Sequence, residues 1–240
     1  MGMILAAVLF LFQLFPSLLE ASPDPASRWN LLYPKIRDGL AAREEAQKEM
    51  RQLEILLKGE YAWAENRRGE GRYLFPLRGY TPHSIGGKRG DGYKPRGYDF
   101  FDGNRHKGHP GHDIFIRDKN QDGLDDRTGK LVEVLTVSSG IVVSVHSEWQ
   151  PGSQTRGGNY VWVFKPNKGQ YYYYAHLNQV FVRVGERVSA GERLGTVGRT
   201  GLNAYPKRSP THLHFSLFQS IDGYPKPADP YSDLVNAACR

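Results

Sequence analysis

The chain has 240 residues, a length that suits one ordinary domain with extensions. Its formal net charge is +7, which suits an anionic partner, but its basic residues are scattered and lack the dense runs of a nucleic-acid-binding tail. Its 27 glycines, 14 tyrosines and 11 phenylalanines favour strands and turns over a helical bundle.

The N-terminal segment 1–22 has an apolar run at 3–14, followed by Pro16 and by small residues at Ala21 and Ser22. This order predicts a secretory signal, although the basic residue that usually precedes the apolar run is missing. The alternative is an uncleaved anchor. Both interpretations export the rest of the chain to the periplasm, the cell envelope or the extracellular space.

Between this segment and the main domain, residues 23–34 are rich in proline and aromatic side chains and are predicted to form a linker. Apolar residues then recur at helical spacing over 35–58, which predicts one amphipathic helix, so that 23–65 forms a linker and a helix. Residues 66–108 are rich in glycine and tyrosine and are predicted to form loops that lead into the main domain.

From Gly111 onward the sequence predicts short strands joined by glycine turns. They are expected at 113–117, in two runs within 132–145, at 160–165, 170–176, 181–184, 193–197 and 212–218. The pair at 160–165 and 170–176 should form a hairpin. The pattern indicates an antiparallel sheet, a sandwich or a partly closed barrel over 109–220, followed by a C-terminal tail at 221–240.

Five of the eight histidines fall into three short clusters. The clusters are His-Pro-Gly-His-Asp at 109–113, Tyr-Ala-His-Leu at 174–177 and Thr-His-Leu-His-Phe at 211–215. Because residues two apart in a strand share a face, His212 and His214 should point the same way, with Leu213 and Phe215 toward the core. A metal ion would explain two imidazoles on one face, because it binds neutral ring nitrogens. A solvated pair is the alternative.

His109 and Asp113 supply a histidine and a carboxylate four residues apart. With one histidine of the third cluster they give three protein ligands, and water would complete the open arrangement of a catalytic zinc site. Iron(II) also suits such a set, and spacing alone leaves His212 and His214 as equal candidates for the third position. The single cysteine, Cys239, excludes a cysteine-ligated zinc site.

His176 is the remaining clustered histidine outside the candidate ligands. No glutamate lies near the three clusters, so histidine is the one credible general base for hydrolysis, although a single histidine at such a position is more often structural. Three further histidines match no pattern and are predicted to lie on the surface: His83, His106 and His146. His112 should face the side of its strand opposite to Asp113.

Taken together, the clusters resemble the lysostaphin-type (LytM-like) zinc endopeptidases, the peptidoglycan DD-metalloendopeptidases. The resemblance covers about 75–220. The matching elements are Phe-Pro-Leu at 75–77, H-x-x-x-D at 109–113, Gly-Asn-Tyr-Val at 158–161, Y-x-H-L at 174–177, the glycine-rich run at 182–201 and His-Leu-His-Phe at 212–215. Each element is weak alone, but their common order makes a chance match improbable.

The resemblance implies zinc ligands at His109, Asp113 and His214, and catalytic histidines at His176 and His212. It implies a mainly β fold, an antiparallel sheet of the duplicated-hybrid-motif sandwich type, with the N-terminal amphipathic helix beside it. It also implies an exported enzyme that hydrolyses peptide cross-links of peptidoglycan through a zinc-activated water.

Two departures from the family pattern stand out. A polar loop follows the H-x-x-x-D strand, and its D-x-N-x-D-G core resembles a calcium loop without the closing glutamate. The candidate calcium ligands are Asp118, Asn120, Asp122 and Asp126. A solvated turn held by Asx bonds is the alternative. In addition, Thr211 replaces the proline that commonly precedes the last histidine pair.

Two other functions remain open at this stage. The predicted helix at 35–58 is compatible with a non-catalytic module that binds peptidoglycan and regulates other wall hydrolases, although such relatives have typically lost metal ligands. A zinc enzyme that acts on another secreted peptide is the third possibility.

Overall fold

The computed structural model describes residues 23–61 and 73–240, so the predicted signal segment lies outside the described residues. The strands are β1 (His112–Phe115), β2 (Glu133–Leu135), β3 (Gly140–His146), β4 (Asn159–Lys165), β5 (Gln170–Val180), β6 (Arg187–Val188), β7 (Arg193–Val197), β8 (His212–Ile221) and β9 (Tyr224–Ala228). The helices are α1 (Pro25–Arg37), α2 (Arg43–Tyr61) and α3 (Tyr231–Val235), with 3₁₀ turns η1 (Pro82–Ser84), η2 (Phe100–Arg105) and η3 (Pro166–Lys168).

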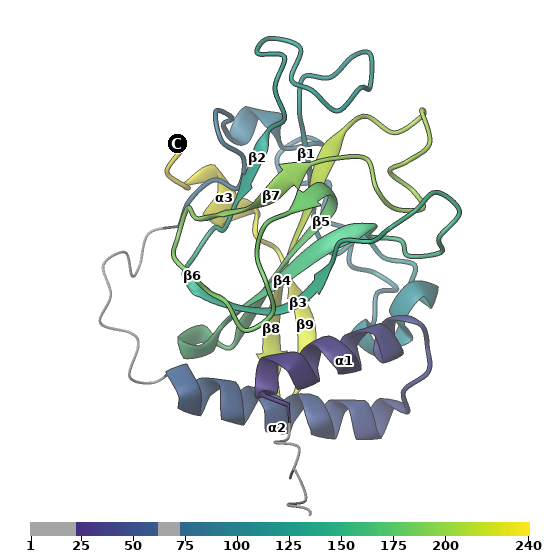
Figure 1. Ribbon diagram of the computed structural model, residues 1–240, viewed down its shortest axis with the longest axis vertical. Coiled ribbons are helices and arrows are strands. Elements are labelled where there is room, and N and C mark those ends of the chain that lie inside the picture. Colours follow the sequence, from purple (N-terminus) through teal and green to yellow (C-terminus); the bar gives the residue numbers. More distant parts are fainter. Residues whose placement is uncertain (1–22, 62–72) are drawn as a thin grey trace, which may run out of the picture.

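The strands form one antiparallel sheet with the order β1-β8-β5-β4-β3-β6, while β9 pairs with β8, β7 with β5, and β2 with β7 (Figure 1). The predicted class, a mainly antiparallel β fold, is confirmed. The predicted hairpin is also present as β4 and β5, which face each other at Phe164 and Tyr171 around η3. None of the helices that the structure describes is both long and apolar enough to span a bilayer.

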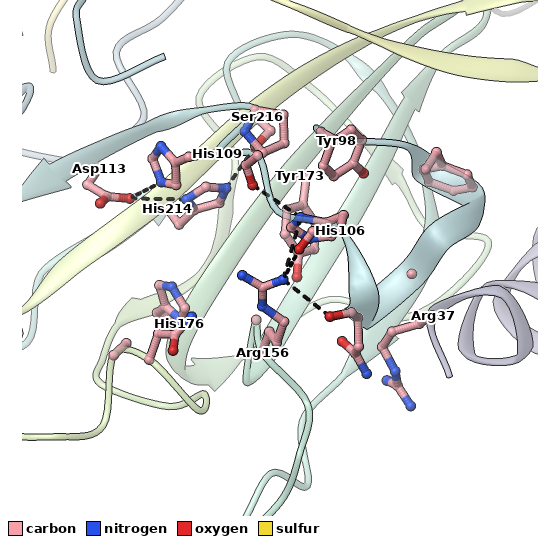
Figure 2. A pocket seen from close by; sticks show the side chains of 18 of the residues that line it. Arg37, Tyr98, His106, His109, Asp113, Arg156, Tyr173, His176, His214 and Ser216 are labelled. Atoms are coloured by element: carbon pink, nitrogen blue, oxygen red, sulfur yellow. Dashed lines mark hydrogen bonds and ion pairs between the residues drawn. The ribbon is translucent and has the colours of Figure 1, made fainter. Parts of the chain in front are cut away.

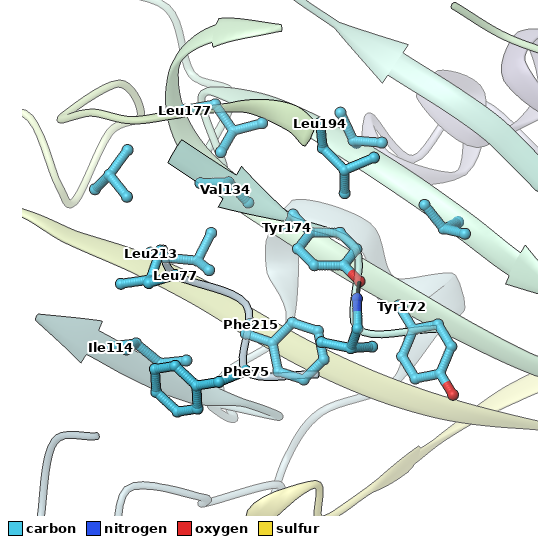
Figure 3. Packing of buried hydrophobic residues seen from close by; sticks show 14 of the residues in the cluster. Phe75, Leu77, Ile114, Val134, Tyr172, Tyr174, Leu177, Leu194, Leu213 and Phe215 are labelled. Atoms are coloured by element: carbon cyan, nitrogen blue, oxygen red, sulfur yellow. Dashed lines mark hydrogen bonds between the residues drawn. The ribbon is translucent and has the colours of Figure 1, made fainter. Parts of the chain in front are cut away.

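The sheet buries both of its faces, and the alternation of side chains divides them into two cores. On β4, Val161 and Val163 point into one core, in which Leu213 and Phe215 of β8 are also fully buried, as predicted (Figure 3). Trp162 of β4 points into the other core, which contains apolar side chains of α1 and α2. His212 and His214 therefore lie on the face toward which the two helices pack.

Two helices occupy the region for which one helix was predicted. The predicted linker at 23–34 is wrong, because Asp24 caps α1 by accepting hydrogen bonds from the backbone N–H groups of Ala26 and Ser27, and Pro25 fits the first helical turn. The predicted helix over 35–58 is interrupted at 38–42, where Gly39 takes a positive φ of 71°. In the sequence, Asp24-Pro25 is typical of the start of a helix and Gly39 of its end, and these residues indicate the bounds of α1.

The two helices lie side by side beneath the sheet (Figure 1). Trp29 of α1 is fully buried and stacks on Tyr33 and Tyr171, at 5.4 and 5.6 Å between ring centroids. Met50 and Leu53 of α2 are buried in the same core. Each such side chain contributes roughly 1.5–3 kcal/mol through burial, which fixes the helices against the face that carries the histidine pair.

The C-terminal segment 221–240 was predicted as a tail, yet it adds β9 to the sheet and ends in α3. The strand predicted at 181–184 is absent, because β5 runs on to Val180 and the chain then leaves the sheet. Over the described part of the predicted loop region, 73–108, the chain forms η1, η2 and isolated β-bridges.

Candidate metal centre and catalytic histidines

The pairing of β1 with β8 brings the first and third histidine clusters together. Asp113 lies directly opposite His214 in the register of these strands. His109 precedes β1, and its main chain is held by two hydrogen bonds with Lys94. As a result the Asp113 Oδ1 atom lies 3.2 Å from His109 Nε2 and 3.0 Å from His214 Nδ1 (Figure 2).

These distances fit a metal site. Ligand atoms in a tetrahedral zinc site with bonds of about 2.0–2.2 Å lie roughly 3.3 Å apart, close to the two separations from Asp113. Among the residues that the structure describes, His109, Asp113 and His214 are the one group of three or more potential ligands that gathers in this way. His212 Nε2 lies farther from Asp113 Oδ1, at 3.6 Å. The geometry therefore favours His214 over His212 as the third ligand.

Each histidine of this group has a second partner that orients its ring. The Nδ1–H of His109 donates to the carbonyl oxygen of Gly92 over 2.9 Å, which directs Nε2 toward Asp113. His214 Nε2 lies 2.9 Å from the hydroxyl oxygen of Ser216, leaving Nδ1 for the site. Sequence analysis did not single out Ser216, although its place two residues beyond His214 on the same strand face was the available signal.

The charges around Asp113 match what a metal site requires. Burial alone would raise the pKa of Asp113, but hydrogen bonds from His109 and His214 hold it far below its usual range. Burial lowers the pKa of His214, whereas at His109 the effect of burial is outweighed by the hydrogen bond to Asp113, which raises the pKa. An ionised carboxylate and neutral imidazoles are the forms that bind a metal ion, and metal binding releases any proton that the histidines hold.

His176 lies beside this group in a β-bulge between β4 and β5. Its φ is +64°, an uncommon value for a residue with a side chain, and its backbone N–H donates to the carbonyl of Gly157. Gly201 packs so closely that a Cβ there would lie 2.9 Å from His176 Nδ1. The bulge turns the imidazole toward His212, with 4.9 Å between ring centroids. Burial lowers the pKa of His176 well below its usual value.

One loop, 198–211, orients both histidines that lie outside the ligand group. His176 Nδ1–H donates to the carbonyl of Thr200 over 2.8 Å, and His212 Nδ1–H donates to the carbonyl of Pro210 over 2.7 Å. Because a carbonyl oxygen only accepts, Nδ1 carries the hydrogen in both rings. Nε2 is therefore the ring nitrogen that no backbone carbonyl engages in either histidine, and that of His212 lies 3.6 Å from Asp113 Oδ1.

A side-chain network holds the same loop in place. Arg199 donates from Nη1 to the carbonyl of Ser209 and to the hydroxyl of Thr211, over 2.8 and 2.9 Å. The buried hydroxyl of Thr211 in turn donates to the Asp118 carboxylate over 2.6 Å. The two departures from the family pattern, Thr211 and the acidic loop, thus form one connected support for the histidine-orienting loop.

The acidic loop shows no sign of a calcium site. Both oxygens of Asp118 accept backbone hydrogen bonds, from Asp122 at 3.0 Å and Gly123 at 2.8 Å. Asp126 accepts a hydrogen bond from the backbone of Lys119, and Asn120 Nδ2 donates to the Asp122 carboxylate. Within the described residues these side chains form no metal-binding group. The Asx-stabilised turn accounts for the loop, and the predicted calcium site has no support.

We expect Thr211→Val to destabilise the protein by about 1–3 kcal/mol, because it removes a buried hydrogen-bond donor to Asp118 and an acceptor for Arg199. Unfolding by urea measures this loss. The same substitution at the exposed Thr128 is the matched control and should change stability by less than about 0.5 kcal/mol. An unfolding midpoint of Thr211→Val equal to that of wild type would contradict the supporting role of the hydroxyl.

A cavity of about 230 Å³ adjoins the histidines, between the sheet and the segment around η2 (Figure 2). Its walls include two arginines, Arg37 and Arg156. They also include aromatic side chains of the helix-facing core: Tyr33, Tyr98, Trp162, Tyr173 and Phe218. His109, Asp113, His176, His212 and His214 all line it. The candidate site therefore opens into a space that can receive a small part of a peptide.

The other four histidines differ in burial and in location. His106 was predicted to lie on the surface, but it is half-buried and lines the cavity, where burial and then the charge of Arg156 lower its pKa to about 4. His83 is exposed as predicted, and His146 is half-buried beside Tyr160. His112 is fully buried on the opposite face of β1, where it contacts Asp229 at 2.9 Å.

Part of the chain is similar to known peptidases. Residues 119–230 match the model of Peptidase family M23, a segment that contains His176, His212 and His214 and begins just after Asp113. The structure is similar to lysostaphin, an antimicrobial peptidase of Staphylococcus simulans, with 23% identity and a TM-score of 0.44, over 69% of this chain and 55% of that one.

Two further solved structures are similar. A zinc-containing peptidase of Vibrio cholerae has 21% identity and a TM-score of 0.42, over 70% of this chain and 41% of that one. A protein of Ruminococcus gnavus, described as a glycyl-glycine endopeptidase LytM, has 19% identity and a TM-score of 0.47, over 90% and 97%. The chain therefore spans about half of the length of lysostaphin and less than half of the length of the Vibrio protein. The family model thus covers somewhat less than half of the chain, and it agrees with the ordered motifs, which resemble those of the lysostaphin-type (LytM-like) enzymes.

Proposed function

We propose that the protein is an exported zinc metalloendopeptidase that hydrolyses peptide cross-links of bacterial peptidoglycan. The observation that carries the proposal is the convergence of five side chains on one cavity. Two imidazoles and a carboxylate gather at metal-binding distances, and two further imidazoles, each with its Nδ1 held by a loop carbonyl, lie beside them in the same cavity. Such a set has no structural purpose on a sheet face that could bury apolar side chains instead.

His109, Asp113 and His214 would hold the zinc ion in this proposal. Zinc bound there would supply a Lewis acid for the peptide carbonyl and lower the pKa of water. His176 Nε2 is placed to take a proton during attack on the scissile bond, and His212 is placed to donate to the developing oxyanion. The two carbonyls of the loop 198–211 engage the Nδ1–H of both rings, so that His176 can accept a proton at Nε2, whereas His212 would donate from Nε2 in its protonated form.

The wall substrate follows from the resemblance to lysostaphin-type enzymes and agrees with the net charge of +7, because the bacterial wall carries anionic polymers. The apolar segment at 1–22 supports export. A non-catalytic regulator of wall hydrolases is the alternative. The complete set of ligands and both flanking histidines favour the enzyme, since a binding module has no use for them.

A zymogram on purified peptidoglycan tests the proposal. We expect a cleared band that disappears with a zinc chelator and returns when zinc is added back, because the three ligands hold the metal reversibly. Mass spectrometry of the released fragments should show new amino and carboxyl termini within the cross-link peptides. Protein with stoichiometric zinc that clears no wall would instead support the regulator, or an enzyme for another secreted peptide.

A further inference from the structure

Arg156 is a cavity residue to which the reaction assigns no role. It lies in the loop between β3 and β4, directly before Gly157, whose carbonyl accepts the backbone hydrogen bond of His176. Figure 2 shows its guanidinium in the cavity, between His176 and His106. The arginine is therefore built into the same turn that positions the candidate base.

One end of the guanidinium is fixed by the protein. Nη1 donates to the carbonyl of His106 over 2.7 Å and to that of Asn104 over 3.3 Å. No hydrogen bond engages Nε or Nη2, and no carboxylate pairs with Arg156, within the part of the chain that the structure describes. The edge of the guanidinium formed by Nε–H and Nη2–H thus remains available to a ligand.

The second arginine of the cavity shows what this edge binds. Arg37 donates from Nε and from Nη2 to the two oxygens of Asp38, over 2.8 and 2.7 Å. Arg117 likewise uses Nε and Nη2 to bind Asp125, over 3.1 and 2.9 Å. Both pairs use the planar fork of arginine, which matches the geometry of a carboxylate.

The charge balance of the cavity also favours an anion. Asp113 is the one acidic side chain among the residues that line it, and in the proposed function its charge is compensated by zinc. Arg37 is neutralised by Asp38, whereas Arg156 keeps an uncompensated positive charge in a half-buried position. Water screens such a charge incompletely, so an incoming carboxylate would be bound more strongly than at the open surface.

We propose that Arg156 forms a subsite for a carboxylate of the peptide substrate close to the scissile bond. This inference rests on the proposed function and names the substrate class: peptides with a free carboxylate within reach of the cleaved bond, in preference to the same peptides with a carboxamide. The carboxylate can belong to a side chain or to a chain terminus. Arg156 would act in substrate binding and specificity, with the Nε and Nη2 groups as donors.

The test uses cross-linked muropeptides released from purified peptidoglycan by a muramidase. Half of the sample is converted to carboxamides with carbodiimide and ammonia. For the wild-type protein, kcat/KM should fall by roughly 10- to 100-fold on the amidated sample, since a charge-assisted pair is lost. Arg156→Gln should cleave both samples equally and slowly, mainly through a higher KM. Arg156→Lys keeps the charge without the fork and should retain a smaller preference.

Equal zinc content and equal thermal stability of the variants exclude a general structural defect. Arg156→Gln that keeps the wild-type preference for the free carboxylate would overturn the proposal. Synthetic peptides amidated at the side chain alone or at the C-terminus alone identify which carboxylate is bound. The amidation that lowers kcat/KM marks the carboxylate that Arg156 binds.

Binding is measured separately, by calorimetry with the same muropeptides and zinc-loaded His176→Asn, which should turn them over at least about 100-fold more slowly than wild type. A carboxylate preference in binding that Arg156→Gln removes supports the subsite even if the wild-type protein cleaves no wall peptide, in which case the proposed function fails alone. Cleavage without any carboxylate preference overturns the subsite and leaves the enzyme in place. If the muropeptides are neither bound nor cleaved, both the subsite and the proposed function are overturned.

Discussion

Replacing His214 by alanine is expected to remove zinc from the purified protein and with it all wall-clearing activity. His214 Nδ1 lies 3.0 Å from Asp113 Oδ1, within the one group of potential metal ligands among the described residues. Loss of a group that merely orients a ligand commonly costs 10- to 100-fold in metal affinity, so loss of a direct ligand should cost at least about 100-fold. Metal analysis after dialysis against a weak chelator measures this.

His83→Ala is the matched control for this prediction, because His83 is exposed and lies outside the cavity. It should retain full zinc. Ser216→Ala gives an intermediate case, since it leaves His214 in place and removes its 2.9 Å partner. Zinc content of His214→Ala equal to that of wild type would show that another residue, with His212 the nearest candidate, completes the site.

The second large effect is expected at His176, where substitution should leave zinc bound and lower kcat by about 10²- to 10⁴-fold, the range for loss of a general acid–base group. His176 is not part of the ligand group, and its Nδ1 is already bonded to Thr200. Asparagine is the best replacement, because it tolerates the positive φ of 64° at this bulge and so preserves the backbone. Steady-state kinetics and metal analysis on one preparation give both quantities.

His146→Asn is the matched control for His176→Asn, because His146 is half-buried but does not line the cavity. Its kcat should stay within a few-fold of wild type, in line with its distance from the reaction. Loss of zinc from His176→Asn would contradict the division of roles between ligands and catalytic histidines. Unchanged kcat with full zinc would assign the role of general base to His212, whose Nδ1 is likewise held by a loop carbonyl.

Side-chain hydrogen bonds connect the acidic loop to the candidate site. In this chain an acidic loop, which resembles a calcium loop in sequence, bonds through Thr211 and Arg199 to the segment that orients His176 and His212. The Asp118 carboxylate accepts the hydrogen bond of the buried Thr211 hydroxyl, and that hydroxyl in turn accepts from Arg199. The loop thus contributes by hydrogen bonding within the protein, and no ion is needed to explain its shape.

The sequence by itself determined the sheet class, the β4–β5 hairpin and the side of β8 on which His212 and His214 lie. These features depend on a period of two along single strands and on glycine and proline at the turns, so neighbouring residues encode them. The grouping of His109 with Asp113 was accessible for the same reason, since four residues separate them. The family motifs added the roles that spacing left open.

Only the tertiary structure decided which groups meet across long sequence distances. The strand register places His214 opposite Asp113, the fold brings η2 and Arg156 to the cavity, and the docking of α1 through Trp29 turns a predicted linker into part of the core. Such contacts depend on loop paths and on bulges such as that at His176, which follow from the packing of the whole domain. No local pattern encodes them, and for this reason the sequence could name candidate metal ligands but could not find Arg199 or Arg156.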